Sequence, residues 1–323
     1  MKRILVTGGA GFLGSHLCDR LIERGDHVVC LDNFCTGSTA NIEHLLDHER
    51  FEVLVADVTK DVAAVGRIDA IAHLACPASP PDYLARPLET LAIGSRGSDA
   101  VLKIAGDQGI RVLLTSTSEI YGDPLVHPQH EDYWGNVNPI GPRSVYDESK
   151  RFAEALFMAH RRALGTDVGI VRIFNTYGPR LRPNDGRVVS NFVAQALRDE
   201  PLTIYGSGSQ TRSFCYVDDL VRGLILMLDG DQTGPVNLGN PAEMTISELA
   251  QLIIRLTDSQ SNVDFYPLPT DDPTCRRPDI TLAEKALGWW PEVDPTDGLR
   301  RTIDWQRSLL LGAAPRSAVV RSS

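Results

Sequence analysis

Three absences narrow the class of this 323-residue protein before any motif is considered. No apolar run is long enough to cross a bilayer, so we expect no membrane attachment. Lysine and arginine (32) are outnumbered by aspartate and glutamate (42), and a net charge of -10 argues against a general nucleic-acid binder. The six cysteines form no CxxC pair, so we expect neither a metal site nor a disulfide framework.

The beginning of the chain also lacks a recognisable targeting segment. Met1-Lys2-Arg3 runs directly into the apolar segment Ile4-Leu5-Val6, without the features of a signal peptide. Scattered thiols in predicted strands and helices are typical of a reducing compartment. These observations predict a cytoplasmic location.

Short apolar runs alternate with helical patterns through the first 175 residues. The runs lie at 4–7, 28–31, 53–56, 70–74, 112–116 and 168–173, and the helical patterns at 12–24, 88–106 and 147–164. Continuously apolar strands that alternate with helices are typical of a parallel sheet covered on both faces. The predicted fold class is therefore α/β, a doubly wound, Rossmann-type parallel sheet.

After about residue 175, proline and glycine become frequent and the predicted elements become shorter. We interpret residues 1–175 as a dinucleotide-binding domain and 176–311 mainly as a smaller C-terminal substrate-binding region. A helix-like stretch suggests that residues from about 213 to 240 return to the first domain. Residues 312–323 are predicted to be a disordered tail.

A glycine-rich loop follows the first predicted strand and opens the first helix. Gly8, Gly11 and Gly14 allow backbone amides to approach a pyrophosphate at the positive end of the helix dipole. Asp32 ends the second strand, where a carboxylate can bind ribose hydroxyls and repel a 2′-phosphate. The pattern therefore predicts NAD rather than NADP. Asp57, with Val58, fits either an adenine contact or a turn.

A second group of residues carries acid-base chemistry. Tyr146 and Lys150 are four residues apart in a predicted helix, so their side chains share one face. An ammonium group beside a phenol favours the phenolate, which can remove a hydroxyl proton during hydride transfer. Thr117 ends a predicted strand at the edge where such sheets bind ligands, and Glu119 follows it. This group predicts an enzyme that oxidises a hydroxyl group.

Several longer motifs allow a family comparison. They are His-Leu-Ala-Cys-Pro-Ala-Ser-Pro-Pro-Asp-Tyr (73–83), Ser-Thr-Ser-Glu-Ile-Tyr-Gly-Asp-Pro (116–124), Arg-Ile-Phe-Asn-Thr-Tyr-Gly-Pro-Arg (172–180) and Tyr-Gly-Ser-Gly-Ser-Gln-Thr-Arg-Ser-Phe (205–214). From Lys2 to about residue 305, the chain resembles UDP-glucuronic acid decarboxylases (UDP-xylose synthases). These enzymes belong to the extended short-chain dehydrogenase/reductase superfamily.

The resemblance implies a role for each matching residue. Tyr146 would be the base and later the acid at the C4 oxygen, tuned by Lys150 and assisted by Thr117. Ser118 and Glu119 would face C5 and C6 of the sugar, and Arg276 would be the active-site arginine. The implied cofactor contacts are Gly8, Gly11, Phe12, Leu13, Gly14, Asp32, Asn33, Phe34, Thr36, Gly37, Asp57, Val58, Leu74, Ala75, Cys76, Tyr146, Lys150, Thr176 and Arg182. The implied substrate contacts are Pro81, Tyr83, Glu119, Asn175, Arg187, Val189, Tyr205, Gln210, Arg212 and Arg276.

The implied reaction begins with oxidation of C4 of a nucleotide-linked glucuronic acid by NAD. The 4-ketone lies beta to the C6 carboxylate and accepts the electron pair released with CO2, which leaves an enolate. Protonation at C5 and return of the hydride to C4 then give a xylose. A 4-epimerase or 4,6-dehydratase of the same fold stays open, although dehydratases carry Asp where this chain has Ser118. A non-catalytic NAD-sensing regulator is a further alternative. Either UDP-glucuronate or TDP-glucuronate would fit as the substrate.

Two further expectations concern charge and assembly. The anionic substrate requires local positive charge, which we assign to Arg180, Arg182, Arg187, Arg212, Arg276 and Arg277. Helices near 88–106 and 147–164, with the apolar stripe Phe152, Leu156 and Ala159, could pair in a homodimer. The chain departs from the family at Ala92 and Gly94, where many members carry lysine and asparagine.

Overall fold

The computed structural model describes residues 1–60, 62, 65–183, 185–268, 273 and 275–312. Of the tail predicted at 312–323, residues 313–323 lie outside the described residues. Within the described part, no helix is both long and apolar enough to cross a membrane.

A seven-stranded parallel sheet forms the centre of the first part of the chain. Its order is β11-β6-β5-β4-β1-β2-β3, so the direction of winding reverses between β1 and β4. The strands are β1 (Arg3–Thr7), β2 (His27–Asp32), β3 (Phe51–Val55), β4 (Ala70–His73), β5 (Arg111–Thr117), β6 (Val168–Ile173) and β11 (Val236–Leu238). All residues of β4 and β5 are buried, as continuously apolar strands require. The predicted fold class is confirmed, and a cleft is expected where the winding reverses.

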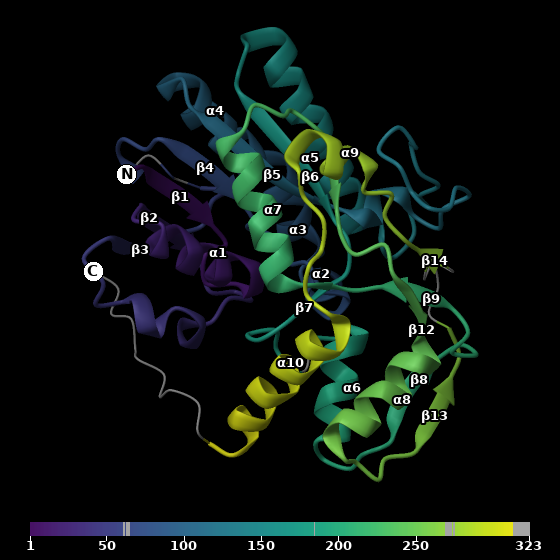
Figure 1. Ribbon diagram of the computed structural model, residues 1–323. Helices are drawn as coiled ribbons and strands as arrows, with labels where there is room; N and C mark the ends of the chain where they lie inside the picture. Colours follow the sequence, from purple (N-terminus) through teal and green to yellow (C-terminus); the bar gives the residue numbers. More distant parts are fainter. Residues whose placement is uncertain (61, 63–64, 184, 269–272, 274, 313–323) are drawn as a thin grey trace.

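Helices cover both faces of this sheet, because alternate strand residues point to opposite sides. Ile4 and Val6 belong to the core under α1 (Phe12–Glu23) and α7 (Val217–Asp229), two helices that lie side by side in Figure 1. Leu5 belongs to the core under α4 (Ser98–Gln108) and α5 (Ser144–Leu164) on the other face. The sheet therefore has two separate hydrophobic layers.

The helix expected over 88–106 is divided. It comprises α3 (Pro87–Ala92), the π-helical turn η4 (Ile93–Gly97) and α4, and it follows the short helix α2 (Pro80–Ala85). At the π turn, a Cβ added to Gly94 would lie 2.5 Å from the Ser149 carbonyl oxygen of α5. The helices approach this closely because position 94 has no side chain. Periodicity alone could not indicate the widened turn.

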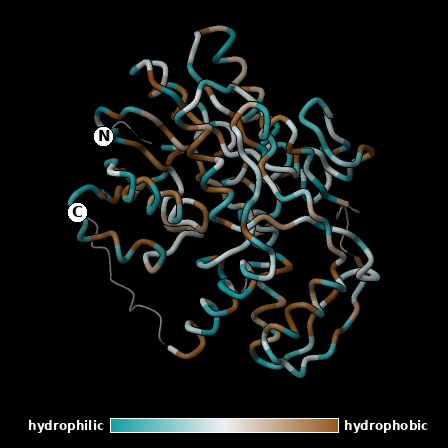
Figure 2. Tube along the Cα trace, viewed as in Figure 1, coloured by the Kyte–Doolittle hydropathy of each residue, from teal (hydrophilic) through white to brown (hydrophobic). Residues whose placement is uncertain are grey.

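The C-terminal part adds three small sheets and three longer helices. β8 (Leu202–Tyr205) pairs with β13 (Val263–Tyr266), and β9 (Thr211–Ser213) lies between β12 (Glu243–Thr245) and β14 (Cys275–Arg276). The longer helices are α6 (Val188–Ala196), α8 (Ile246–Thr257) and α10 (Pro295–Leu310), with the shorter α9 (Thr281–Leu287) before α10. Figure 2 shows hydrophobic positions both in the sheet region and around α6 and α8.

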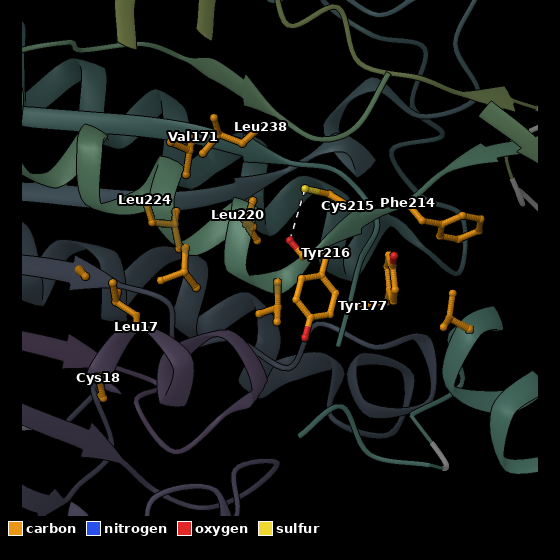
Figure 3. Close-up of a cluster of buried hydrophobic side chains, with 14 of the residues drawn as sticks. Leu17, Cys18, Val171, Tyr177, Phe214, Cys215, Tyr216, Leu220, Leu224 and Leu238 are labelled. Carbon is orange, nitrogen blue, oxygen red and sulfur yellow. Dashed lines mark hydrogen bonds between the residues drawn. The ribbon is translucent and has the colours of Figure 1, made fainter. Parts of the chain in front are cut away.

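The two parts share one buried layer. β7 (Thr176–Tyr177) pairs in parallel with β10 (Cys215–Tyr216), and Figure 3 shows Tyr177, Phe214 and Tyr216 beside the leucines of α7. The rings of Tyr177 and Tyr216 meet edge to face, with centroids 5.7 Å apart. β11 then returns to the large sheet and pairs with β6. The domain limits given above stay a prediction.

Candidate active site

The glycine loop between β1 and α1 has the close backbone packing that a dinucleotide site needs. A Cβ on Gly14 would lie 2.1 Å from the Gly8 carbonyl oxygen, and one on Gly8 would lie 2.8 Å from Ala75 Cα. Gly8 also has a φ of 72°, which favours glycine. Gly11 is the N-cap residue of α1, whose first turn carries no acidic side chain. The positive end of the helix dipole is therefore open to an anion.

Asp32 is the last residue of β2 and lies beside this loop. Its carboxylate accepts hydrogen bonds from the amides of Ala10 (3.0 Å) and Phe34 (2.8 Å). Burial raises the pKa of Asp32, while those amides act in the opposite direction. A Cβ on Gly37 would lie 2.9 Å from an Asp32 oxygen. Asp32 thus orders the loop as well as lining the cleft.

A large cleft runs from the glycine loop to α5. It encloses about 1430 Å³, part of it open to solvent. The predicted residues that line it are Gly8, Gly11, Phe12, Leu13, Gly14, Asp32, Asn33, Thr36, Asp57, Val58, Leu74, Ala75, Cys76, Thr117, Ser118, Glu119, Tyr146, Lys150, Asn175, Thr176, Arg182 and Arg187. Asp57 also accepts two hydrogen bonds from Thr59, so both roles considered for it are compatible with the structure.

Tyr146 and Lys150 share one buried face of α5, as their spacing indicates. Lys150 Nζ lies 6.0 Å from the centroid of the Tyr146 ring and donates a 2.8 Å hydrogen bond to the Thr115 carbonyl oxygen. Burial raises the pKa of Tyr146, as do Cys76 and Glu119, whereas Arg187 and a hydrogen bond with Thr117 act against this rise. The depression of the Tyr146 pKa expected from Lys150 is therefore not seen in the structure.

Glu119 is the centre of an ion cluster at the end of the cleft beside α5. It follows Thr117 in the 3-10 turn η5 (Ser118–Tyr121), where the Thr117 hydroxyl accepts a hydrogen bond from the Glu119 amide. Arg276 from β14 donates to Glu119 Oε1 at 2.7 Å, and Arg143, just before α5, donates to Oε2. Burial alone would raise the pKa of Glu119, but Arg276 and Arg143 hold it well below its usual range. Glu119 is therefore ionised near neutral pH.

Other predicted residues do not line this cleft. Tyr83 lies one layer behind it, stacked on Tyr146 with ring centroids 5.1 Å apart. Val189 is in the core, and Tyr205 is exposed beside Tyr266. Six further predicted residues also lie outside the lining of the cleft: Phe34, Gly37, Pro81, Gln210, Arg212 and Arg276.

Most of the expected arginines have partners within the chain. The ion pairs are Arg180 with Asp19, Arg182 with Asp82, Arg187 with Asp185, Arg276 with Glu119 and Arg277 with Glu243. Arg212 instead donates to the carbonyl oxygens of Thr211 and Pro273. The positive charge of this region is thus partly balanced by carboxylates, which the expectation from sequence did not include.

Sequence reasoning missed several residues of the site, among them Arg143 and Asp82. Arg143 is the second partner of Glu119, yet nothing in its spacing distinguishes it from a surface arginine. Asp82 lines the cleft and binds Arg182, although its position in the family motif at 73–83 could have indicated it.

The two positions at which the chain departs from the family pattern have different surroundings. Ala92 is partly buried, whereas Gly94 lies against Ser149 and leaves no room for a side chain.

The fold and this cleft define a Rossmann-type dinucleotide-binding protein with a tyrosine and a lysine at the carboxyl edge of its sheet. The chain belongs to the NAD dependent epimerase/dehydratase family, whose model matches residues 4–239. It is 54% identical over 304 residues to UDP-glucuronic acid decarboxylase 1 of Danio rerio, covering 94% of this chain and 72% of that protein. It is 52% identical over 309 residues to UDP-glucuronic acid decarboxylase 1 of Arabidopsis thaliana, covering 96% and 71%.

Solved structures show the same architecture at lower identity. UDP-glucuronic acid 4-epimerase from Bacillus cereus, in complex with UDP-glucuronic acid and NAD, aligns with a TM-score of 0.87 and 28% identity. The alignment covers 95% of this chain and 99% of that one. The dTDP-glucose 4,6-dehydratase from Streptomyces venezuelae, with NAD bound, gives 0.86 and 30%, covering 95% and 97%.

NAD is the cofactor of this family, and the cleft fits it. Gly8 and Gly14 provide a cradle that added side chains would fill, at the open N-terminus of α1. The carboxylate of Asp32 lies at the end of β2 and disfavours a 2′-phosphate. The residues that would hold NAD are therefore the glycine loop, Asp32 and Lys150.

Proposed function

We propose that this protein is a UDP-glucuronic acid decarboxylase, which converts UDP-glucuronate to UDP-xylose and CO2. Identities of 51–54% to the eight curated decarboxylases compared support this assignment. The solved epimerases and dehydratases named above are only 28–30% identical. The observation that carries the proposal is the set of acid-base groups around Tyr146 and Glu119 in the cleft.

The residues of the cleft have different roles in the proposed reaction. The chemistry that bound NAD supplies is reversible hydride exchange at C4 of the sugar. Tyr146 takes up the proton of the C4 hydroxyl and later returns it, with Thr117 orienting that oxygen. Lys150 is held by the Thr115 carbonyl oxygen, where its charge favours the phenolate form of Tyr146. Arg276 acts on this site through its ion pair with Glu119, which lines the cleft.

The protonation states argue against dehydration. Elimination of water needs an acid that protonates the leaving oxygen. Ser118 is too weak an acid, and Glu119 is kept ionised by Arg276 and Arg143. Loss of CO2 needs no such acid, because the ketone at C4 accepts the electron pair. The same arrangement therefore supports decarboxylation and not a 4,6-dehydratase.

Product analysis tests the proposal directly. Purified protein incubated with UDP-glucuronate should release CO2 and give UDP-xylose, which NMR identifies from its missing C6. A parallel incubation with TDP-glucuronate tests our preference for uridine. Formation of UDP-galacturonate without gas would identify a 4-epimerase instead.

A Tyr146→Phe variant tests the assigned base. It should keep NAD and lose nearly all turnover, on the order of 10² to 10⁴-fold, because general acid-base catalysis contributes that much. Tyr177→Phe is the matched control, since this buried phenol donates to the Pro295 carbonyl oxygen outside the cleft. CO2 release at the normal rate from Tyr146→Phe would contradict the assignment.

We also propose a cytoplasmic homodimer. Leu88 on α3 and Phe152 on α5 are 77% and 52% exposed, and these two helices pack against each other. Pairing of the same faces in two copies would cover these side chains. Light scattering at micromolar concentration should give twice the mass of one chain, and a purely monomeric protein would exclude the dimer.

A further inference from the structure

Asp82 and Arg182 form an ion pair between two segments of the cleft wall, and the proposed reaction gives Asp82 no role. Asp82 belongs to α2, which follows β4, and Arg182 lies 100 residues later in the chain, after β7. Both residues line the cleft, as do the glycines of the cofactor loop. The pair therefore joins two parts of the wall that are distant in sequence.

Each member of this pair has one further polar partner for its side chain in the described part of the protein. Asp185 lies 3.9 Å from the guanidinium of Arg182, but it belongs to the same segment of the chain. Asp82 Oδ2 accepts a 2.6 Å hydrogen bond from the hydroxyl of Ser79, the N-cap residue of α2. Asp82 is thus held by its own helix and presents its charge to the segment that carries Arg182.

Residues 179–182, which we call the strap, connect α1 with α2. His16 Nε2 of α1 donates a 2.9 Å hydrogen bond to the Pro179 carbonyl oxygen, and Arg180 forms a 2.7 Å ion pair with Asp19 of the same helix. At its other end the strap reaches α2 through the ion pair described above. Three of its four residues line the cleft. The strap is therefore a piece of the cleft wall that is held at both ends.

The attachment to α2 is the weaker of the two. The side chain of Arg182 is 42% exposed, compared with 20% for Arg180, so solvent screens its ion pair more strongly. Arg187 supports this end by donating a 2.9 Å hydrogen bond to the carbonyl oxygen of Ala78, just before α2. Loss of the charge at position 82 should therefore loosen the strap without freeing it.

The proposed reaction is redox-neutral only while the cofactor stays bound. Oxidation at C4 transfers a hydride to NAD, and the last step returns that hydride to the 4-ketone. If NADH leaves before this step, the hydride leaves with it, and the net products are CO2, NADH and a UDP-linked 4-keto-pentose. The proton lost from the C4 hydroxyl and the proton taken up at C5 balance. A complete reaction therefore requires slow release of the dinucleotide.

We propose that Asp82 is a positioning residue, which holds Arg182 and the strap against α2 and so retains the cofactor until the 4-ketone has been reduced. A ligand leaves a cleft more slowly when the wall segments around it are tied together. The consequence for the product rests on the proposed function, whereas retention of the dinucleotide does not. Asp82 acts through Arg182 and the strap.

Release of NAD in the absence of sugar tests this role. The protein, loaded with isotopically labelled NAD, is mixed with excess unlabelled NAD, and rapid filtration follows the loss of label. The variants are Asp82→Asn, Arg182→Gln and the double variant. Asparagine keeps the size of the side chain and an oxygen that can accept from Ser79, so α2 keeps its cap.

We expect each single variant to release NAD about three- to fivefold faster than the wild type, the upper range for a partly exposed ion pair. The double variant should release it no faster than either single variant, because each substitution already removes the whole pair. Salt of about 1 M should reduce the difference between the wild type and Asp82→Asn, since it screens the pair.

Asp229→Asn is the matched control. Asp229 pairs with Arg24 and Lys2 and does not line the cleft, so NAD release should stay at the wild-type rate. Equal release from the wild type and Asp82→Asn would overturn the proposal. So would additive effects in the double variant, or a far larger effect of Arg182→Gln than of Asp82→Asn, since Arg182 would then act on the dinucleotide without Asp82.

Product partition is the second readout. With UDP-glucuronate, Asp82→Asn should raise the share of UDP-linked 4-keto-pentose and free NADH relative to UDP-xylose about threefold or more, in line with its faster release of cofactor. An unchanged share would overturn the proposed consequence of the ion pair and leave the proposed function intact. Absence of CO2 from the wild type would instead overturn the proposed function, and the release rates measured without sugar would still decide the role of Asp82.

Discussion

Replacing Gly94 by alanine tests the contact between η4 and α5, which carries the catalytic tyrosine and lysine. The added Cβ would lie 2.5 Å from the Ser149 carbonyl oxygen and 2.8 Å from its Cβ. Ordinary contacts are about an ångström longer, so the two helices must separate. Overpacking of this kind costs about 1–3 kcal/mol in the free energy of unfolding.

Helix propensity acts in the opposite direction. Alanine is favoured over glycine inside a helix by about 0.5–1 kcal/mol. The sum predicts a net loss of up to about 2.5 kcal/mol for Gly94→Ala, with a central value of about 1 kcal/mol. The matched control is Gly106→Ala in α4, where the nearest atom to the new Cβ is Thr166 Oγ1 at 3.7 Å. Gly106→Ala should therefore stabilise the protein.

Urea unfolding at fixed protein concentration and saturating NAD measures both variants. The two substitutions should change the free energy of unfolding in opposite directions. Turnover of Gly94→Ala should also fall, because α5 positions Tyr146 and Lys150. If Gly94→Ala were as stable as Gly106→Ala and fully active, the close packing of η4 on α5 would be refuted.

Two further predictions concern the cofactor loop and the decrease in the free energy of unfolding at acid pH. Gly14→Ala should destabilise the protein and abolish NAD retention, since its Cβ would lie 2.1 Å from the Gly8 carbonyl oxygen. Gly11→Ala, which meets the same oxygen at 3.1 Å, should lower the unfolding free energy clearly less than Gly14→Ala in urea titrations. Burial and then the charge of Lys150 lower the pKa of His73 to about 3. Neutral His73 therefore stabilises the fold above its unfolded pKa of about 6.5, and this stability is lost as the pH falls towards 3. Between pH 7 and pH 5 the free energy of unfolding, measured by urea titration, should fall by about 2 kcal/mol less in His73→Asn than in the wild type. An equal fall in both proteins would assign the loss of stability at acid pH to other groups.

The sheet was predictable because its strands are buried on both faces. The runs at 4–7, 112–116 and 168–173 match β1, β5 and β6 within two residues at either end. β11 was not separable as a strand, because Val236–Leu238 is too short to show periodicity. The π turn was missed because it depends on Ser149, far along the chain.

The candidate site was also predictable only in part. The glycine spacing and the pair Tyr146 and Lys150 are local patterns, so the sequence alone indicated them. The partners of Glu119 depend on tertiary structure, since Arg276 lies 157 residues away along the chain and Arg143 lies 24 residues away.

The return of β11 to the large sheet has a consequence for dissecting the protein. A fragment that stops at residue 175 would leave β6 with an unpaired edge and would uncover the apolar surface beneath α7. Such a fragment should aggregate when expressed alone. Shortened versions of this enzyme, or exchanges of its sugar-binding half between relatives, therefore need breakpoints that keep residues up to Leu238 with the nucleotide-binding half.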